Sequence, residues 1–191
     1  DIPSHQQSRK SDVYQISKAG NKVIWARGNG WVFAGIARIL THLPQDHPSR
    51  GRFESLFREM AYSLKQRQGD DGFWRMNLDD PTDFSMSESS GTGFFTYGMA
   101  WGVNNGLLPA DEFLPVIARS WDALYHNVSD DGLVQWGQPV GAGPYDIRQT
   151  DSHEYVTGTF LLAGSEVLKL AKKGSFSATK NNESPADATE K

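Results

Sequence analysis

The sequence predicts an all-α fold made of helical hairpins, and three observations lead to that prediction. Two stretches carry apolar residues at helical spacing on one face only. Three other stretches are apolar nearly all round, and the two kinds alternate with a period of about 60 residues. No strand-like alternation persists beyond a few residues. Stacked hairpins of this kind predict a helical toroid, with covered helices in an inner ring and amphipathic helices in an outer ring.

The amphipathic stretches are the expected outer helices. Their apolar residues recur three or four positions apart, which places them on one helical face. The first stripe is Phe53, Leu56, Phe57, Met60, Ala61 and Leu64, and the second is Phe113, Ile117, Trp121 and Leu124.

The expected inner helices are the stretches 31–37, 94–103 and 160–170. A helix without a polar face must be covered on several sides. Each stretch is preceded by a glycine-containing segment, at 28–30, 91–93 and 157–159. We expect these segments to form turns in which the missing side chains let a ligand approach the backbone.

Two Asp-Asp-Gly segments mark the repeat. They begin at Asp70 and Asp130, and each is followed by a tryptophan, Trp74 or Trp136. This organisation amounts to about two and a half hairpins, which would leave one face of an inner helix uncovered. We therefore expect either pairing with a second copy or further hairpins before Asp1.

The domain organisation follows from composition. Residues 21–171 form the predicted helical-hairpin domain, which corresponds to part of an α/α toroid. Residues 1–20 read as a polar loop segment, and residues 172–191 as a disordered polar tail with one large apolar residue, Phe176.

Composition also excludes several classes of protein. The chain has 191 residues, a net charge of −4 and no long basic block, which argues against a nucleic-acid-binding domain. It contains no cysteine, and no apolar run approaches the length of a membrane span. Five scattered histidines have no metal-ligand spacing, so we predict no metal site.

The segment from Trp25 to Trp31 is the densest candidate site. Two indoles, the Arg27 guanidinium and the Asn29 amide lie around one expected helix N-terminus. Aromatic faces stack on sugar rings, and arginine binds carboxylates through two parallel hydrogen bonds. The pattern suits an acidic sugar. The alternative is that both tryptophans belong to the core and Arg27 forms a structural ion pair.

Other polar residues are weaker candidates. The Asp-Asp-Gly segments resemble acid/base pairs, but aspartate and glycine are ordinary turn residues after a helix. Glu88 precedes the second glycine segment and is a better-placed carboxylate. His153 and Glu154 begin like a zinc-protease helix, but Thr157 stands where the second histidine is needed. As a polar pair at the start of a helix, they remain candidates for substrate contact.

Several collinear motifs resemble glycoside hydrolase family 105, the unsaturated rhamnogalacturonyl hydrolases. The first is the run Trp-Ala-Arg-Gly-Asn-Gly-Trp-Val-Phe-Ala-Gly at 25–35. The resemblance extends over about residues 5–171 and includes six further segments, at 46–50, 71–75, 90–95, 101–108, 138–141 and 160–167.

The resemblance implies a fold, a substrate class and a reaction. The family fold is an (α/α)6 toroid of six hairpins. The substrates are pectin-derived oligosaccharides that carry a 4,5-unsaturated uronic acid, which is removed by hydration of its vinyl ether without a metal or organic cofactor. By motif position, Trp25, Arg27 and Trp31 match substrate-contacting residues, and we add Asn29 from the same turn. The family occurs in the bacterial cytoplasm and periplasm.

The resemblance also implies a missing part. The family's catalytic aspartate lies farther upstream of this motif than the chain extends before Trp25, so it has no counterpart here. We therefore expect a C-terminal half of a toroid that is inactive alone, and that needs an N-terminal half or a second chain to complete it. A histidine of the family's site would fall near His5.

Two other functions compete with this hypothesis. One is a family 88 unsaturated glucuronyl hydrolase on the same toroid. The other is a non-catalytic helical-repeat module that binds acidic sugars or a partner chain.

Overall fold

A computed structural model of the chain describes residues 16–141 and 143–175. This part folds into five helices and contains only isolated β-bridges, which confirms the all-α prediction. The predictions for the first fifteen residues, His5 among them, and for the tail beyond residue 175 lie outside the described residues. None of the described helices is long and apolar enough to cross a bilayer.

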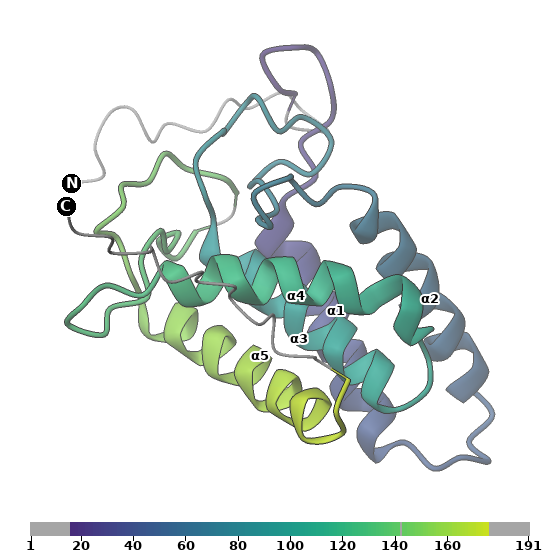
Figure 1. The fold of residues 1–191 in the computed structure, drawn as a ribbon. Helices are drawn as coiled ribbons and strands as arrows, with labels where there is room; N and C mark the ends of the chain where they lie inside the picture. Colours follow the sequence, from purple (N-terminus) through teal and green to yellow (C-terminus); the bar gives the residue numbers. More distant parts are fainter. Residues whose placement is uncertain (1–15, 142, 176–191) are drawn as a thin grey trace, which may run out of the picture.

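The helices alternate between two directions, as hairpins require. They are α1 (Ala26–His42), α2 (Arg50–Lys65), α3 (Ser89–Asn104), α4 (Ala110–His126) and α5 (Glu154–Lys172). The segments 43–49 and 105–109 join them at one end, and the long connections 66–88 and 127–153 gather at the other (Figure 1). The N-termini of α1, α3 and α5 therefore share one end of the molecule with the long connections.

Helix α3 lies at the centre of the fold. All residues from Ser89 to Gly102 are buried, and α3 packs against α1, α4 and α5. Aromatic rings fill the core around it, and the rings of Phe33 and Phe57 stack at 4.6 Å between centroids. The prediction that this helix is covered on several sides is confirmed.

The flanking inner helices are covered less completely than predicted. Trp31 and Val32 on α1 are 54% and 52% exposed, and Leu161 on α5 is 64% exposed. The Trp31 ring is covered on one side by Phe94 of α3, with 4.3 Å between the ring centroids. The exposed flanks agree with the prediction that an incomplete stack leaves an inner helix uncovered.

The glycines of the inner helices serve packing more than the predicted ligand approach. They lie inside the first turns of the helices and not in turns before them. A Cβ on Gly30 would lie 2.9 Å from the Cβ of Phe94, and one on Gly93 would lie 2.5 Å from the Thr159 Oγ1. The absence of these side chains lets α1 and α5 approach α3 closely. Gly158, in contrast, faces open space.

Candidate functional site at the inner-helix N-termini

The predicted site segment lies where the N-termini of α1, α3 and α5 meet the long connections. The first N–H of α1, from Ala26, donates to the Met76 carbonyl at 2.8 Å. The first N–H of α3, from Ser89, donates to the Trp136 carbonyl at 3.0 Å. Connection 66–88 is thus hydrogen-bonded to the start of α1, and connection 127–153 to the start of α3. Both connections can therefore place side chains beside the helix N-termini.

Arg27 is the central charged residue of this end. Its side chain comes from the first turn of α1, and the residue is only 3% exposed. Its guanidinium donates to the carbonyls of Gln138 at 2.9 Å and Pro139 at 2.8 Å. It also donates to the hydroxyl of Tyr155, which in turn donates to the Gln138 carbonyl. These bonds hold the segment 138–139 against α1 and α5.

Aromatic rings lie near the guanidinium on two residues. The Arg27 Cζ lies 4.6 Å from the centroid of the Trp25 ring and 5.0 Å from that of Tyr155, distances at which cation–π attraction contributes. The His153 ring lies parallel to the Tyr155 ring, with centroids 5.6 Å apart. Trp25, Arg27 and His153 were all predicted as site residues, and they lie in one cluster around Tyr155, which was not predicted.

The charge of Arg27 has no ion-pair partner in the described part of the chain, so the alternative of a structural ion pair is wrong there. Backbone carbonyls and a hydroxyl solvate the guanidinium, and they carry only partial negative charge. A buried cation without a counter-ion is costly compared with one that is paired. This end of the molecule is therefore electrostatically suited to an anion.

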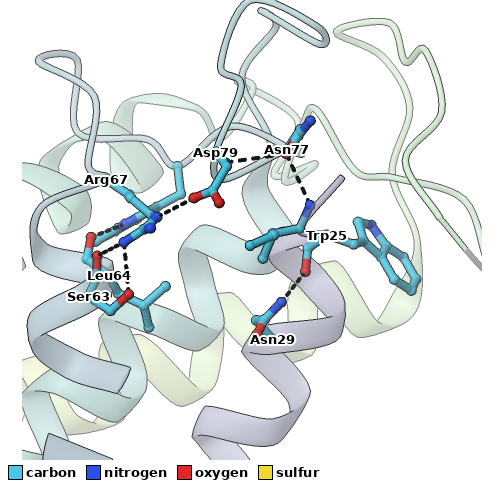
Figure 2. Close-up of polar contacts among 9 residues, drawn as sticks. Trp25, Asn29, Ser63, Leu64, Arg67, Asn77 and Asp79 are labelled. Atoms are coloured by element: carbon cyan, nitrogen blue, oxygen red, sulfur yellow. Dashed lines mark hydrogen bonds and ion pairs between the residues drawn. The ribbon is translucent and has the colours of Figure 1, made fainter. Parts of the chain in front are cut away.

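Trp25 connects α1 to the second long connection. It stands at the N-cap of α1 without capping the helix, and its Nε1 donates to the Gln138 Oε1 at 2.9 Å. The Asn77 Oδ1 accepts from the preceding Ile24 N–H at 3.1 Å. Figure 2 shows the indole directed away from Asn29 and Asn77, toward the outside of this cluster.

Asn29 and Trp31 differ from the prediction that they surround one turn with Arg27. The Asn29 side-chain amide donates to the Trp25 carbonyl at 2.9 Å and so secures the helix start (Figure 2). Trp31 is half exposed on the flank of α1, where the centroid of its ring lies 4.3 Å from the centroid of the Phe94 ring. Its indole is available as a stacking surface, and substrate contact by either residue stays a prediction.

Glu88 caps α3 from inside the protein. Its carboxylate accepts from the N–H groups of Ser90 at 2.9 Å and Gly91 at 2.7 Å, and from the Ser90 hydroxyl. The residue is fully buried. Burial raises the pKa of the Glu88 carboxyl, whereas these hydrogen bonds and the nearby Arg27 charge lower it by less. Its described bonds are those of a structural N-cap, and a contact with substrate stays a prediction.

His153 stands at the N-cap of α5, with no side-chain capping bond, and is partly exposed. Its ring is held by the parallel contact with Tyr155. In the described part of the chain, no three His, Asp or Glu side chains gather closely enough to hold a metal ion.

The Asp-Asp-Gly segments take the turn role that the sequence analysis weighed against acid/base chemistry. The Asp71 Oδ1 accepts from the Phe73 N–H at 3.3 Å, and its Oδ2 pairs with Arg75 at 2.7 Å. Gly72 and Gly132 both have φ +87°, a backbone conformation that favours glycine. The Ser129 hydroxyl likewise donates to Asp131, so one aspartate of each pair is held by contacts within its own turn.

Comparison with known proteins places the chain in a family. The sequence profile described as Glycosyl Hydrolase Family 88 matches residues 4–171. The chain belongs to glycosyl hydrolase family 88. The sequence analysis named family 105 first and family 88 as its sibling, so the match is to the alternative.

Individual relatives agree with the family. An unsaturated 3S-rhamnoglycuronyl hydrolase of Alteromonas sp. (strain LOR) is 46% identical over 152 residues, which are 80% of this chain and 37% of that protein. A solved family 88 structure from Bacteroides vulgatus is 35% identical with a TM-score of 0.77, covering 81% of this chain and 45% of that one.

A more distant structure, a possible member of family GH105 from Salmonella enterica, shares the fold. It is 23% identical with a TM-score of 0.69, and the match covers 78% of this chain and 40% of that one. The toroid prediction is therefore confirmed, and this chain spans less than half the length of the relatives that it matches.

Within this family 88 chain, sequence reasoning missed three residues at the site: Gln138, Tyr155 and Trp136. Gln138 and its carbonyl bind Trp25 and Arg27, although the two segments are more than one hundred residues apart. Tyr155 stands one position after the Glu154 that was considered, and only the fold brings its hydroxyl to Arg27. Trp136 has φ +57°, which is strained by about 1–3 kcal/mol for a bulky residue.

A separate cavity of about 340 Å³ lies at the other end of the inner helices, among residues such as Arg38, Tyr97 and Lys169. It contains none of the predicted site residues. Lys169 pairs with the buried Glu166 at 2.6 Å, and Lys173 donates to the Asn104 carbonyl at 3.2 Å. These cations lie at helix C-termini, where positive charge complements the helix dipoles.

Proposed function

We propose that this family 88 chain is the substrate-binding part of an unsaturated uronyl hydrolase. The substrate would be an oligosaccharide with a 4,5-unsaturated uronic acid linked to rhamnose. The support for rhamnose is the 46% identical relative, whose name states that it is an unsaturated 3S-rhamnoglycuronyl hydrolase. Pectin as the source of this oligosaccharide is part of the same proposal.

One observation carries the proposal: the Arg27 guanidinium is buried beside helix N-termini and has no ion pair in the described structure. The carboxylate of an unsaturated uronic acid supplies the missing negative charge. Arginine retains N–H groups beyond those that bind Gln138, Pro139 and Tyr155, because a guanidinium has five. The N-terminus of α1 adds its own preference for an anion.

The proposed reaction is the hydration of a vinyl ether. A proton is added at C4 of the unsaturated sugar, and water adds at C5 to give a hemiketal. The hemiketal then opens by cleavage of the bond between C5 and the ring oxygen, which leaves a ketone at C5 and a hemiacetal at C1. The hemiacetal collapses to an aldehyde and releases the remainder of the oligosaccharide as an alcohol. In this scheme Arg27 binds the carboxylate, and Trp25, Trp31 and His153 contact the sugar. We assign the proton donor to the upstream aspartate that the family resemblance implies, and not to Glu88, which is buried and caps α3.

The test is a binding and turnover panel with the full chain. The ligands are a 4,5-unsaturated uronyl-rhamnose disaccharide, its saturated counterpart and an unsaturated glucuronyl-hexosamine disaccharide. Calorimetry reports binding, and the ultraviolet absorbance of the double bond reports hydration. We expect the unsaturated uronyl-rhamnose ligand to bind most tightly.

The outcomes separate the candidate functions. Preference for the hexosamine ligand would favour a glucuronyl hydrolase. Binding without loss of absorbance would mean that this chain binds substrate but does not turn it over alone. Absence of binding to every member of the panel would reject the proposed function.

A further inference from the structure

The two complete hairpins carry equivalent turns, and this equivalence gives Trp136 a counterpart. In the first turn, the Gly72 N–H donates to the Gly69 carbonyl at 2.9 Å, and in the second the Gly132 N–H donates to the Ser129 carbonyl at 2.8 Å. Four residues after each of these glycines, a carbonyl accepts the first N–H of an inner helix. That carbonyl belongs to Met76 in one hairpin and to Trp136 in the other.

Each Asp-Asp-Gly segment is followed by a tryptophan, but Trp74 stands two residues after its glycine and Trp136 stands four residues after its glycine. The residue that corresponds to Trp74 is Val134, which is buried in the same way. Trp136 instead takes the place of the fully buried Met76. The second hairpin therefore has an extra tryptophan that its fold does not need for the core position.

Trp136 differs from its counterpart in both backbone and exposure. It is half buried, whereas Met76 has no exposed surface. Its φ of +57° makes it the one non-glycine residue with a positive φ in the described ranges 16–141 and 143–175. A bulky side chain in this conformation is unfavourable, and such residues cluster at binding and active sites.

The position of Trp136 brings it close to the charged part of the site. Only Gly137 separates it from Gln138, whose carbonyl accepts from Arg27. Two residues of chain span at most about 7 Å, which is comparable to the width of a sugar ring. No described aromatic ring stacks on the Trp136 indole, and part of the residue is exposed to solvent.

We propose that the Trp136 indole stacks on the sugar ring attached to the unsaturated uronic acid that Arg27 holds. This proposal rests on the proposed function, because it assumes that a uronate occupies the Arg27 position. Trp136 is then a residue that determines preference for the second sugar, and it does not take part in the hydration step. The strained backbone keeps the indole outside the core position that Met76 fills in the first hairpin.

The experiment measures the affinity of two ligands for Trp136→Gly. The ligands are the unsaturated uronyl-rhamnose disaccharide and the methyl glycoside of the unsaturated uronic acid, which has no second sugar. Glycine adopts φ +57° without strain, so we expect the melting temperature to stay constant or to rise. We expect the disaccharide to bind about tenfold more weakly, and the methyl glycoside to bind as before.

Two control variants refine the comparison. Trp136→Phe retains an aromatic face and should restore most of the affinity for the disaccharide. Leu133→Ala removes a partly exposed apolar side chain from the same connection and should change neither affinity.

The proposal is overturned if Trp136→Gly binds the disaccharide normally or loses affinity for both ligands equally. A fall of several degrees in the melting temperature would overturn it too, because it would identify the indole as a core residue. Failure of the proposed function has a different signature: the unsubstituted chain would bind neither ligand, and this proposal would fail with it.

Discussion

The N-termini of α1 and α3 occupy equivalent positions in two hairpins, but only one of them is capped by a side chain. In α3 the N-cap residue Glu88 accepts hydrogen bonds from the first-turn N–H groups with its own carboxylate. In α1 the N-cap residue is Trp25, whose side chain makes no capping bond. The N-terminus of α3 is capped by a buried carboxyl group, whereas the N-terminus of α1 has a buried arginine that makes no direct ion pair with a described side chain.

Under the proposed function, this difference separates a structural N-terminus of the repeat from the one that binds the ligand. Glu88 demonstrates that an inner-helix N-terminus of this fold can hold a carboxylate, with bonds of 2.7 and 2.9 Å. At α1 the same backbone geometry is present, but no described side chain supplies the carboxylate. The comparison therefore indicates which of the two N-termini is available to an acidic ligand.

The largest expected effect is the loss of ligand affinity when the Arg27 charge at the N-terminus of α1 is removed. Arg27→Ala should weaken binding of the unsaturated uronyl methyl glycoside by about 30-fold or more, since truncating one member of a buried charge pair costs about 2–5 kcal/mol. Calorimetric titration measures the change. Unchanged affinity would mean that Arg27 does not hold the carboxylate.

Arg27→Lys is the matched control for this prediction. It keeps the positive charge but loses the planar fork that reaches Gln138 and Pro139 together. We expect an affinity between those of the alanine variant and the unsubstituted chain. A lysine variant as weak as the alanine variant would indicate that geometry matters more than charge.

Removal of the Glu88 cap at the N-terminus of α3 should lower the stability of the fold. Glu88→Ala leaves the N–H groups of Ser90 and Gly91 without their acceptor, so we expect the free energy of unfolding to fall by about 2 kcal/mol. Denaturant unfolding measures this change. Glu88→Gln keeps an acceptor oxygen, so its free energy of unfolding should fall by less than that of Glu88→Ala. A larger fall in the glutamine variant than in the alanine variant would contradict the capping role.

A smaller effect should follow from giving α1 a cap like that of α3. Trp25→Asp places a carboxylate at its N-cap beside Arg27, where it competes with an acidic ligand. Trp25→Asn loses the same indole but adds no charge. We expect the aspartate variant to bind the methyl glycoside about tenfold more weakly than the asparagine variant. Equal affinities, measured by titration, would contradict an anion site at α1.

The smallest effect is a pH dependence at Glu88. Burial raises the pKa of its carboxyl above the ordinary value of 4.5, so the folded state binds more protons than the unfolded state just above that pH. The stability of the chain relative to Glu88→Gln should therefore be greatest at or below pH 4.5 and should fall as the pH rises through the raised pKa. Unfolding curves across this range test the sign, and a rise with pH would contradict it.

Much of the fold could be predicted from local pattern. The spacing of Phe53, Phe57 and Leu64 identified the face of an outer helix, and all three residues are at least partly buried on α2. The apolar run at 94–103 predicted a helix covered on several sides, and α3 is such a helix. Both predictions succeed because helical periodicity and burial are properties of neighbouring residues in one segment.

The site could be predicted only in part. Trp25, Arg27 and His153 were selected from their chemistry, and they do lie at one cluster. Gln138 and Tyr155 could not be found in this way, because their role depends on contacts with a helix more than one hundred residues earlier. Glu88 was selected for its carboxylate, but the sequence did not reveal that α3 buries and caps it.

The sequence by itself determined the helices, their alternation and the residue types available for an acidic sugar, because these depend on periodicity and side-chain chemistry. Only the tertiary structure decided that a carboxyl side chain caps the N-terminus of α3 and that no side chain caps the N-terminus of α1. It also decided that the backbone of Trp136 has a positive φ. The physical reason is that capping, burial and backbone strain depend on hydrogen-bond partners from distant segments, and those partners are set when the hairpins pack together.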